Sequence, residues 1–307
     1  MRRHKSFPAL ACAALLAAGV ACQDPGDLPA SEQVREVLTA SWPVSSLAER
    51  LAPVDVPVRC ALPAGEDPIT WDPPREVVAE FQRAALVALN GAGLEGWAEH
   101  ASLPSSRTVD TSAALGSKLL EQSGTVHSHG PAGEHTHGGV DPHTFLDPTL
   151  LVPMAGALRD GLARAFPEDR AGIEERATAL IEDLRALDAE HRALAEVLQG
   201  RRLVASHPAY DYLARTYGWD LTNLDLDPEV PLDEGTLAAV REAVGAGALA
   251  LLWESAPLPA TAARLQEELG VPSIVWSPAE APDPDREGDF LSIQQQNISR
   301  LLALVQD

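Results

Sequence analysis

The sequence predicts an α/β fold of two lobes, each built on a mostly parallel sheet, joined by one long rigid helix with a cleft between the lobes. Short apolar, β-rich runs alternate with helical patterns in both halves of the 307-residue chain, which is long enough for two ordinary domains. Alternation of this kind is typical of βαβ units on parallel sheets. Between the two halves, residues 167–199 carry apolar side chains at helical spacing over about nine turns.

The first half of the mature chain is expected to form the N-terminal lobe, residues 22–166. Its apolar runs predict strands at 34–40, 56–62, 85–90 and 107–112. Its helical patterns predict helices at 43–51, 74–84 and 147–166. A histidine-rich loop, residues 123–140, precedes the last of these helices and has no apolar periodicity.

The linking helix, 167–199, is followed by a C-terminal lobe at 200–307. Strands are expected there at 202–206, 221–226, 249–254 and 273–277. Helices are expected at 209–217, 233–244, 260–269 and 289–305. Because ligands of parallel sheets bind beyond the carboxyl ends of the strands, the cleft between the lobes is the natural site.

The N-terminus carries the pattern of a secretory signal peptide, residues 1–21. Basic side chains at Arg2, Arg3 and Lys5 precede an apolar run that is too short to span a membrane. The sequence GVAC at 19–22 resembles a bacterial lipobox, with glycine where leucine is usual. We expect cleavage before Cys22 and lipid attachment to it, with plain cleavage as the alternative. The mature protein is then expected in the periplasm or cell envelope, with membrane contact only through this anchor.

The net charge of the chain excludes one class of partner. The chain has 23 basic and 45 acidic residues, and loss of the signal removes three of the basic ones. So acidic a protein repels phosphate backbones and attracts cations, so nucleic acid is excluded as a partner.

Only Cys60 remains inside the mature chain, which rules out a disulfide framework and predicts that Cys60 is a small buried hydrophobe. The apolar content of the chain provides sizeable cores without oligomerisation, and a monomer is expected.

Two motifs suggest enzymes but fail on context. Residues 91–96 read G-x-G-x-x-G after an expected strand, with Asp110 near the place of a ribose-binding acid. Pro104 ends the following helix too early for the unit that binds a dinucleotide, so a glycine-rich turn is the better interpretation. Neither H-E-x-x-H nor G-x-S-x-G occurs, and the neighbours Ser206 and His207 do not form a nucleophile and base pair.

The histidines are the stronger indication of chemistry. His143 follows Asp141 and Pro142 just before an expected helix, and His207 lies where the strand 202–206 ends. Glu254 ends another strand of the same lobe as His207. Any one of these alone is more often a satisfied polar group, but all three fall on the rim where the lobes face each other. Their joint placement predicts a metal site.

Five stretches in register resemble the metal-binding receptors of bacterial zinc and manganese ABC importers. They are NGAGLEGW at 90–97, DPHTFLDP at 141–148, SHPAYDYLARTYG at 206–218, DPEVPLDEGTL at 227–237 and LLWES at 251–255. The resemblance covers nearly all of the mature chain. It implies two α/β lobes, a rigid connecting helix, a cation held in the cleft and delivery of that cation to an ABC permease.

The resemblance also implies ligands, of which two carry over and two do not. The second and third histidine ligands fall on His143 and His207, whereas Ile69 occupies the place of the first. The acidic ligand that many members have after the last strand is not found at Ser277 and Pro278. The candidates for replacing the missing ligands are Glu66, Asp67, Glu254, His127, His129, His135 and His137.

The loop histidines allow two interpretations. Either the loop is solvated, mobile without metal, and gathers cations near the cleft, or one of its histidines completes the site, since two neutral ligands fall short of the four that zinc usually takes. Nitrogen-rich coordination favours Zn²⁺, while Mn²⁺, Ni²⁺ and Co²⁺ remain open. The predicted function is therefore an extracytoplasmic zinc receptor without catalytic turnover. The alternatives are a metal buffer or chaperone without an importer partner and, more weakly, a zinc-dependent hydrolase.

Overall fold

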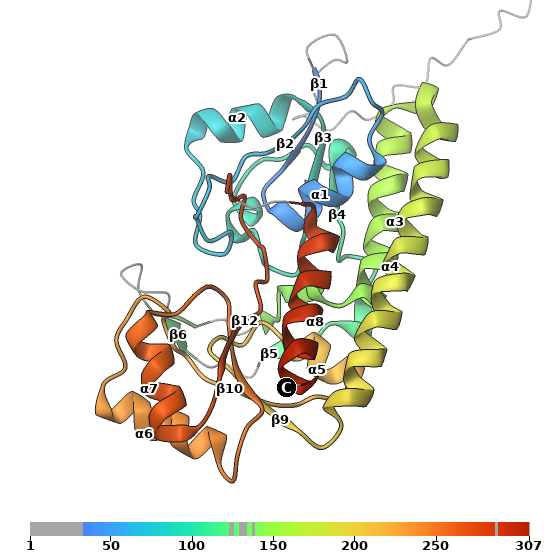
Figure 1. Ribbon diagram of the computed structural model, residues 1–307. Helices are drawn as coiled ribbons and strands as arrows, with labels where there is room; N and C mark the ends of the chain where they lie inside the picture. Colours follow the sequence, from blue (N-terminus) through green and yellow to red (C-terminus); the bar gives the residue numbers. More distant parts are fainter. Residues whose placement is uncertain (1–32, 123–125, 129–133, 137–138, 286–287, 307) are drawn as a thin grey trace, which may run out of the picture.

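Two four-stranded parallel sheets form the centres of two lobes in a computed structural model of the chain, in agreement with the predicted fold class (Figure 1). The structure describes residues 33–122, 126–128, 134–136, 139–285 and 288–306. The first sheet has the order β2-β1-β3-β4, formed by Val34–Thr39 (β1), Val58–Cys60 (β2), Ala84–Leu89 (β3) and Thr108–Asp110 (β4). The second has the order β10-β9-β11-β12, formed by Arg202–Ala205 (β9), Asp220–Asn223 (β10), Ala250–Trp253 (β11) and Ser273–Val275 (β12).

The helices of the first lobe begin where sequence signals predict. They are α1 (Trp42–Leu51), α2 (Arg75–Arg83) and α3 (Pro148–Ala165). Proline near the first position of α1 and α3 suits a helix start, because the missing N–H would have no partner there. The Asp147 side chain caps α3 by accepting a hydrogen bond from the backbone N–H of Thr149 at 2.8 Å.

A single long helix, α4 (Arg170–Leu198), connects the lobes as predicted, after one 3₁₀ turn at Pro167–Asp169. At 1.5 Å per residue its 29 residues extend over about 43 Å. Its buried face recurs at helical spacing, with Ile173, Ala177, Leu180, Leu184, Leu187, His191, Leu194 and Leu198. α3 and α4 run side by side along one edge of the molecule (Figure 1).

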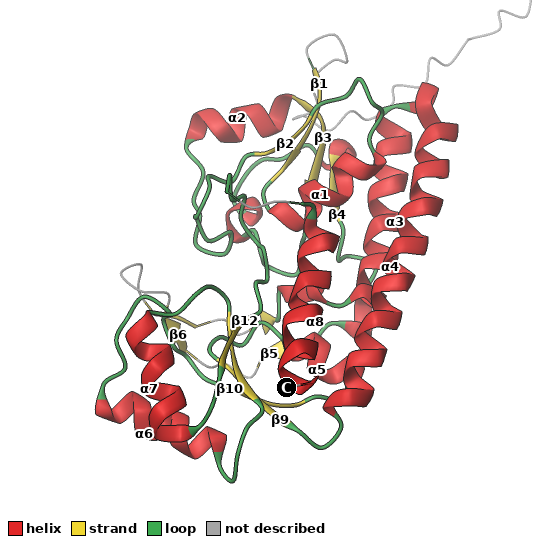
Figure 2. Ribbon diagram, viewed as in Figure 1, coloured by secondary structure: helices red, strands yellow, loops and turns green. Residues whose placement is uncertain are grey.

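In the described part of the second lobe, the α-helices are α5 (Asp211–Tyr217), α6 (Glu234–Val244), α7 (Pro259–Leu269) and α8 (Phe290–Gln306). Figure 2 shows α6 and α7 together at the far side of this lobe from α4. They bury Val240 and Leu265 against Leu251 and Trp253 of β11. α5 and α7 each end at a glycine in the left-handed conformation, Gly218 and Gly270, as C-terminal helix caps commonly do.

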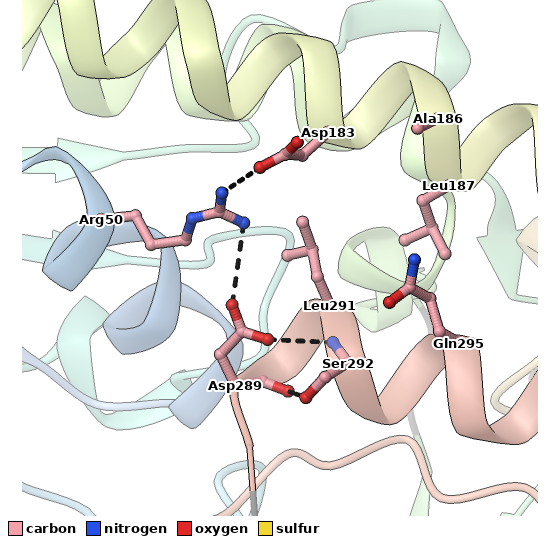
Figure 3. A pocket seen from close by; sticks show the side chains of 8 residues that line it. All are labelled: Arg50, Asp183, Ala186, Leu187, Asp289, Leu291, Ser292 and Gln295. Atoms are coloured by element: carbon pink, nitrogen blue, oxygen red, sulfur yellow. Dashed lines mark hydrogen bonds and ion pairs between the residues drawn. The ribbon is translucent and has the colours of Figure 1, made fainter.

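The chain returns to the first lobe after β12 and then enters α8. The backbone N–H of Trp42 donates to the carbonyl of Glu280 at 2.8 Å, and the N–H of Phe290 donates to the Ser46 hydroxyl at 3.1 Å. Figure 3 shows Arg50 of α1 paired with Asp183 of α4 and with Asp289, which precedes α8. These contacts, beside a cavity of about 420 Å³, fasten the returning segment to both the first lobe and the long helix.

The histidine-rich stretch is not wholly irregular, contrary to expectation. β5 (Glu121–Gln122) pairs with β8 (Gly139–Val140), and β6 (Val126–Ser128) pairs with β7 (Glu134–Thr136), both antiparallel. Backbone groups need hydrogen-bond partners whatever the side chains, and this pairing supplies them. The mobility predicted for this stretch stays a prediction, as do the domain boundaries at 166 and 199.

Two further expectations concern exposure and the membrane. Cys60, at the end of β2, is half-buried, and burial raises the pKa of its thiol to about 11, which suits an unreactive packing residue. No helix among the described residues is both long enough and apolar enough to cross a membrane. The signal peptide and Cys22 lie outside the described residues.

Candidate metal-binding site

His143 is held by the aspartate two residues before it. Asp141 Oδ1 accepts a hydrogen bond from the His143 backbone N–H at 2.9 Å and lies 2.7 Å from the ring Nδ1. Both side chains are almost fully buried. An aspartate commonly bonds the backbone two residues on, so the sequence D-P-H itself favours this turn. The contact fixes the ring and leaves Nε2 available, as for histidines that bind metals.

The atom next to His143 Nε2 belongs to a residue that sequence reasoning missed. Glu280 Oε1 forms an ion pair with Nε2 at 3.3 Å, and neither atom has a further hydrogen-bond partner among the described residues. Two ligand atoms bound tetrahedrally to one zinc ion at 2.0–2.2 Å are separated by about 3.3–3.5 Å. The pair therefore has the separation of two ligands of one metal.

The segment that carries Glu280 is fixed by side chains of the second lobe and, through the backbone N–H of Trp42, by the first lobe. The Tyr210 hydroxyl donates to the carbonyl of Trp276 at 2.6 Å, and the Asn297 side chain bonds both the N–H and the carbonyl of Ser277. Ala279 has a φ of 57°, a left-handed conformation that is costly for a residue with a Cβ. This turn places the acid three residues beyond Ser277, where a search at the strand end does not find it.

The second lobe contributes His207, which lies two residues beyond β9 and is 7% exposed. Its ring centroid lies 5.6 Å from that of His143, with the rings nearly perpendicular. The α5 helix, which follows His207, also contacts the segment before His143. Its Tyr212 hydroxyl donates to the Asp141 carbonyl at 2.9 Å and accepts from the Leu120 N–H at 3.0 Å. The two histidines predicted from the sequence are thus brought together and held there.

Glu254, the first residue after β11, adds a second carboxyl from this lobe. Burial and then the negative charge of Glu280 raise the pKa of Glu254 to about 7. Burial alone would lower the pKa of His143, but Asp141 and Glu280 outweigh it and raise that pKa to about 10. Both raised pKa values show that negative charge in the metal-free cleft favours bound protons. A divalent cation could neutralise the same charge in their place.

The remaining candidates are placed less closely. Asp67 accepts a hydrogen bond from the backbone N–H of Ile69 at 2.8 Å and so shapes its own turn, although its charge still raises the pKa of Glu254. Glu66 is exposed, and Ile69 packs against the core. In the short ribbon of β6 and β7, His127 lies opposite His135.

The structure therefore brings part of a site together. His129 and His137 lie outside the described residues. Among those that are described, no three histidine, cysteine, aspartate or glutamate side chains already form a metal-binding group. The described geometry thus supplies one pair at ligand separation and two further candidate ligands facing it.

Two parallel α/β lobes, a long connecting helix and such a cluster between them define a class of solute-binding receptors. The chain belongs to the family described as zinc-uptake complex component A, periplasmic, whose family model matches residues 37–303.

Relatives and solved structures agree with this assignment. The zinc-binding lipoprotein AdcA of Streptococcus pneumoniae serotype 4 is 27% identical over 275 residues, which are 86% of this chain and 54% of AdcA. The chain thus spans about half the length of that relative. The high-affinity zinc uptake system protein ZnuA of Bacillus subtilis is 24% identical over 303 residues, covering 96% of this chain and 95% of ZnuA. The fold matches the metal-dependent lipoprotein YcdH of Bacillus subtilis with a TM-score of 0.76, 21% identity and coverage of 89% and 99%.

Proposed function

We propose that the protein is an extracytoplasmic zinc receptor that binds the cation between its lobes and delivers it to an ABC permease. The observation that carries this proposal is the ion pair of His143 Nε2 and Glu280 Oε1 at 3.3 Å, beside the His207 ring of the other lobe, which lies 5.6 Å from that of His143. Such a receptor needs no catalytic turnover of its own. It needs ligands on both lobes, so that metal binding and the arrangement of the lobes depend on each other.

The proposed ligands are His143 and Glu280 on one side of the cleft and His207 on the other, with Glu254 as the fourth. Two imidazoles and two carboxylates give four ligands, the number that zinc usually takes. In this set Glu280 takes the place of an acidic ligand after the last strand, and Glu254 compensates for Ile69. Zinc is favoured over Mn²⁺, Ni²⁺ and Co²⁺ because the family and both curated relatives are named for zinc.

Lipid attachment at Cys22 would keep the receptor near its permease. The lipobox-like sequence at 19–22 supports it, and the S. pneumoniae relative is named a lipoprotein. Metabolic labelling with a radioactive fatty acid tests the anchor. Label should enter the wild-type chain but not a Cys22→Ala variant.

Zinc affinity of the untagged mature protein tests the ligand set. His143→Ala, His207→Ala and Glu280→Ala should each weaken binding by at least about tenfold, or about 1.4 kcal/mol. The matched control is His100→Ala, which changes an exposed histidine of the first lobe. Wild-type affinity in both histidine variants would show that the metal binds elsewhere.

A metal buffer without an importer is the competing function. The two functions differ in their partner. A receptor should, when loaded with zinc, stimulate the ATPase activity of its ABC permease complex reconstituted in vesicles. A His143→Ala variant should not do so. No stimulation of the permease complex by the zinc-loaded protein would favour the buffer.

A further inference from the structure

The glycine-rich turn at 91–96 has a role other than nucleotide binding. The Glu95 carboxylate, itself buried, accepts hydrogen bonds from the backbone N–H groups of Asn90 at 2.9 Å and Gly91 at 3.1 Å. In a dinucleotide site such backbone donors would face the pyrophosphate. Here they are occupied by a side chain of the same turn.

The turn aims the Asn90 side chain at the segment that carries His143. Asn90 is fully buried, and its Nδ2 donates to the carbonyl of Pro142 at 3.0 Å. Its Oδ1 accepts from the hydroxyl of Thr144 at 3.3 Å. Ser112, beyond β4, supports the same hydroxyl at 3.1 Å. The Asn90 amide therefore bonds the residues directly before and directly after His143.

His143 needs such support because its local structure is weak. It begins a 3₁₀ helix of four residues, His143–Leu146, and such short turns have poor hydrogen-bond geometry. Asp141 fixes the ring but belongs to the same loop, so it cannot hold that loop in place against the lobe. Asn90 can, because it extends from the end of β3 in the central sheet.

We propose that Asn90 is a positioning residue for zinc, which sets where His143 lies relative to Glu280 and His207. This inference rests on the proposed function. Outer contacts of this kind typically change metal affinity by about 10–100-fold when they are removed. The role also accounts for the Asn90–Trp97 stretch, which the ligands themselves do not use.

Three variants of the mature protein test the proposal. Asn90→Asp removes the donor to Pro142, and Thr144→Val removes the hydroxyl on the other side of His143 without changing its size much. Thr111→Val is the matched control, since its equally buried hydroxyl donates to the backbone carbonyls of Leu89 and Asn90, and its loss leaves the Asn90 side-chain bonds to Pro142 and Thr144 in place. The measurements are zinc affinity, the visible absorption spectrum of the Co²⁺-loaded protein, and thermal stability without metal.

Zinc affinity should fall by at least about tenfold in Asn90→Asp and several-fold in Thr144→Val, with an altered Co²⁺ spectrum in each. Thr111→Val should lose stability but keep the wild-type affinity and spectrum. Thr144→Val keeps the proposal testable if Asn90→Asp does not fold.

Two outcomes would overturn the proposal for different reasons. If His143→Ala loses zinc while Asn90→Asp and Thr144→Val keep wild-type affinity and spectrum, or if Thr111→Val loses affinity equally, Asn90 has no positioning role and the proposed function stands. If His143→Ala itself keeps its affinity, the proposed function fails, and the role of Asn90 fails with it.

Discussion

Acid should destabilise this protein through His191, a buried histidine of the long helix. Its side chain is fully buried and stacks on Tyr217 with ring centroids 5.0 Å apart and planes 13° apart. Neither ring nitrogen has a hydrogen-bond partner among the described residues. Burial lowers the pKa of His191 to about 4, although the charge of Asp188 opposes the shift. The imidazole is therefore neutral in the folded protein at pH 7.

The size and sign of the effect follow from the two pKa values. The unfolded chain takes up its proton as the pH falls through about 6.5, whereas the folded protein does so only near 4. Between these values protons favour the unfolded state, so stability is complete above pH 6.5 and is lost as the pH falls towards 4. At ~1.36 kcal/mol per pKa unit, the loss approaches about 3 kcal/mol.

Urea unfolding at pH 7, 6, 5 and 4.5 in a His191→Phe variant measures this loss. Replacing histidine with phenylalanine also changes the side-chain volume, which shifts the free energy of unfolding by the same amount at every pH. Only the pH dependence of the difference therefore tests the reasoning. The free energy of unfolding of the wild type, minus that of the variant, should fall steadily over this range. His100→Gln should follow the wild-type curve because the side chain of His100 meets water in both states. A difference between wild type and His191→Phe that stays constant with pH would refute the buried neutral histidine.

Three further predictions concern zinc and packing. Zinc should be released as the pH falls from about 7 to 5, because it must displace the proton of His143, whose raised pKa keeps it protonated over this whole range, and also the proton that Glu254 takes up below about pH 7. Equilibrium dialysis should show affinity falling by about tenfold per pH unit for each displaced proton. Deleting residues 125–138 should lower zinc stoichiometry but keep one tight site if the histidine-rich stretch only gathers cations, whereas loss of the tight site would make a loop histidine a ligand. Gly161→Ala should lower the free energy of unfolding, measured with a chemical denaturant, by about 1–3 kcal/mol, since its new Cβ would lie 2.4 Å from Val109 Cγ2. The control is Gly156→Ala in the same helix, whose Cβ would meet nothing within 4 Å and which should be neutral or stabilising.

The lobes and the long helix could be predicted because each element carries its own signal. β11 is a continuous apolar run, as strands buried on both faces are, and α4 repeats its buried positions over its whole length. The short strands in the histidine-rich stretch could not be predicted. β5 and β8 are two residues each and exist only because the chain brings them together.

The same distinction divides the candidate site. His207 lies just beyond β9, so the parallel sheet alone places it at the cleft. His143 is predicted instead from the turn of Asp141 and Pro142 just before α3. Glu280 lies on the segment that returns to the first lobe and is aimed by the strained Ala279 and the N–H of Trp42. Neither signal is visible in a local pattern of residue types. A contact between residues so far apart in the chain requires the folded structure.

Anomalous X-ray diffraction at the zinc edge, from crystals of the zinc-loaded mature protein, tests the central claim most directly. The account predicts one strong peak between the lobes, about 2.0–2.2 Å from His143 Nε2 and from a Glu280 oxygen, with His207 also bound to it. A strongest peak on the histidine-rich stretch, with none beside His143, would contradict it.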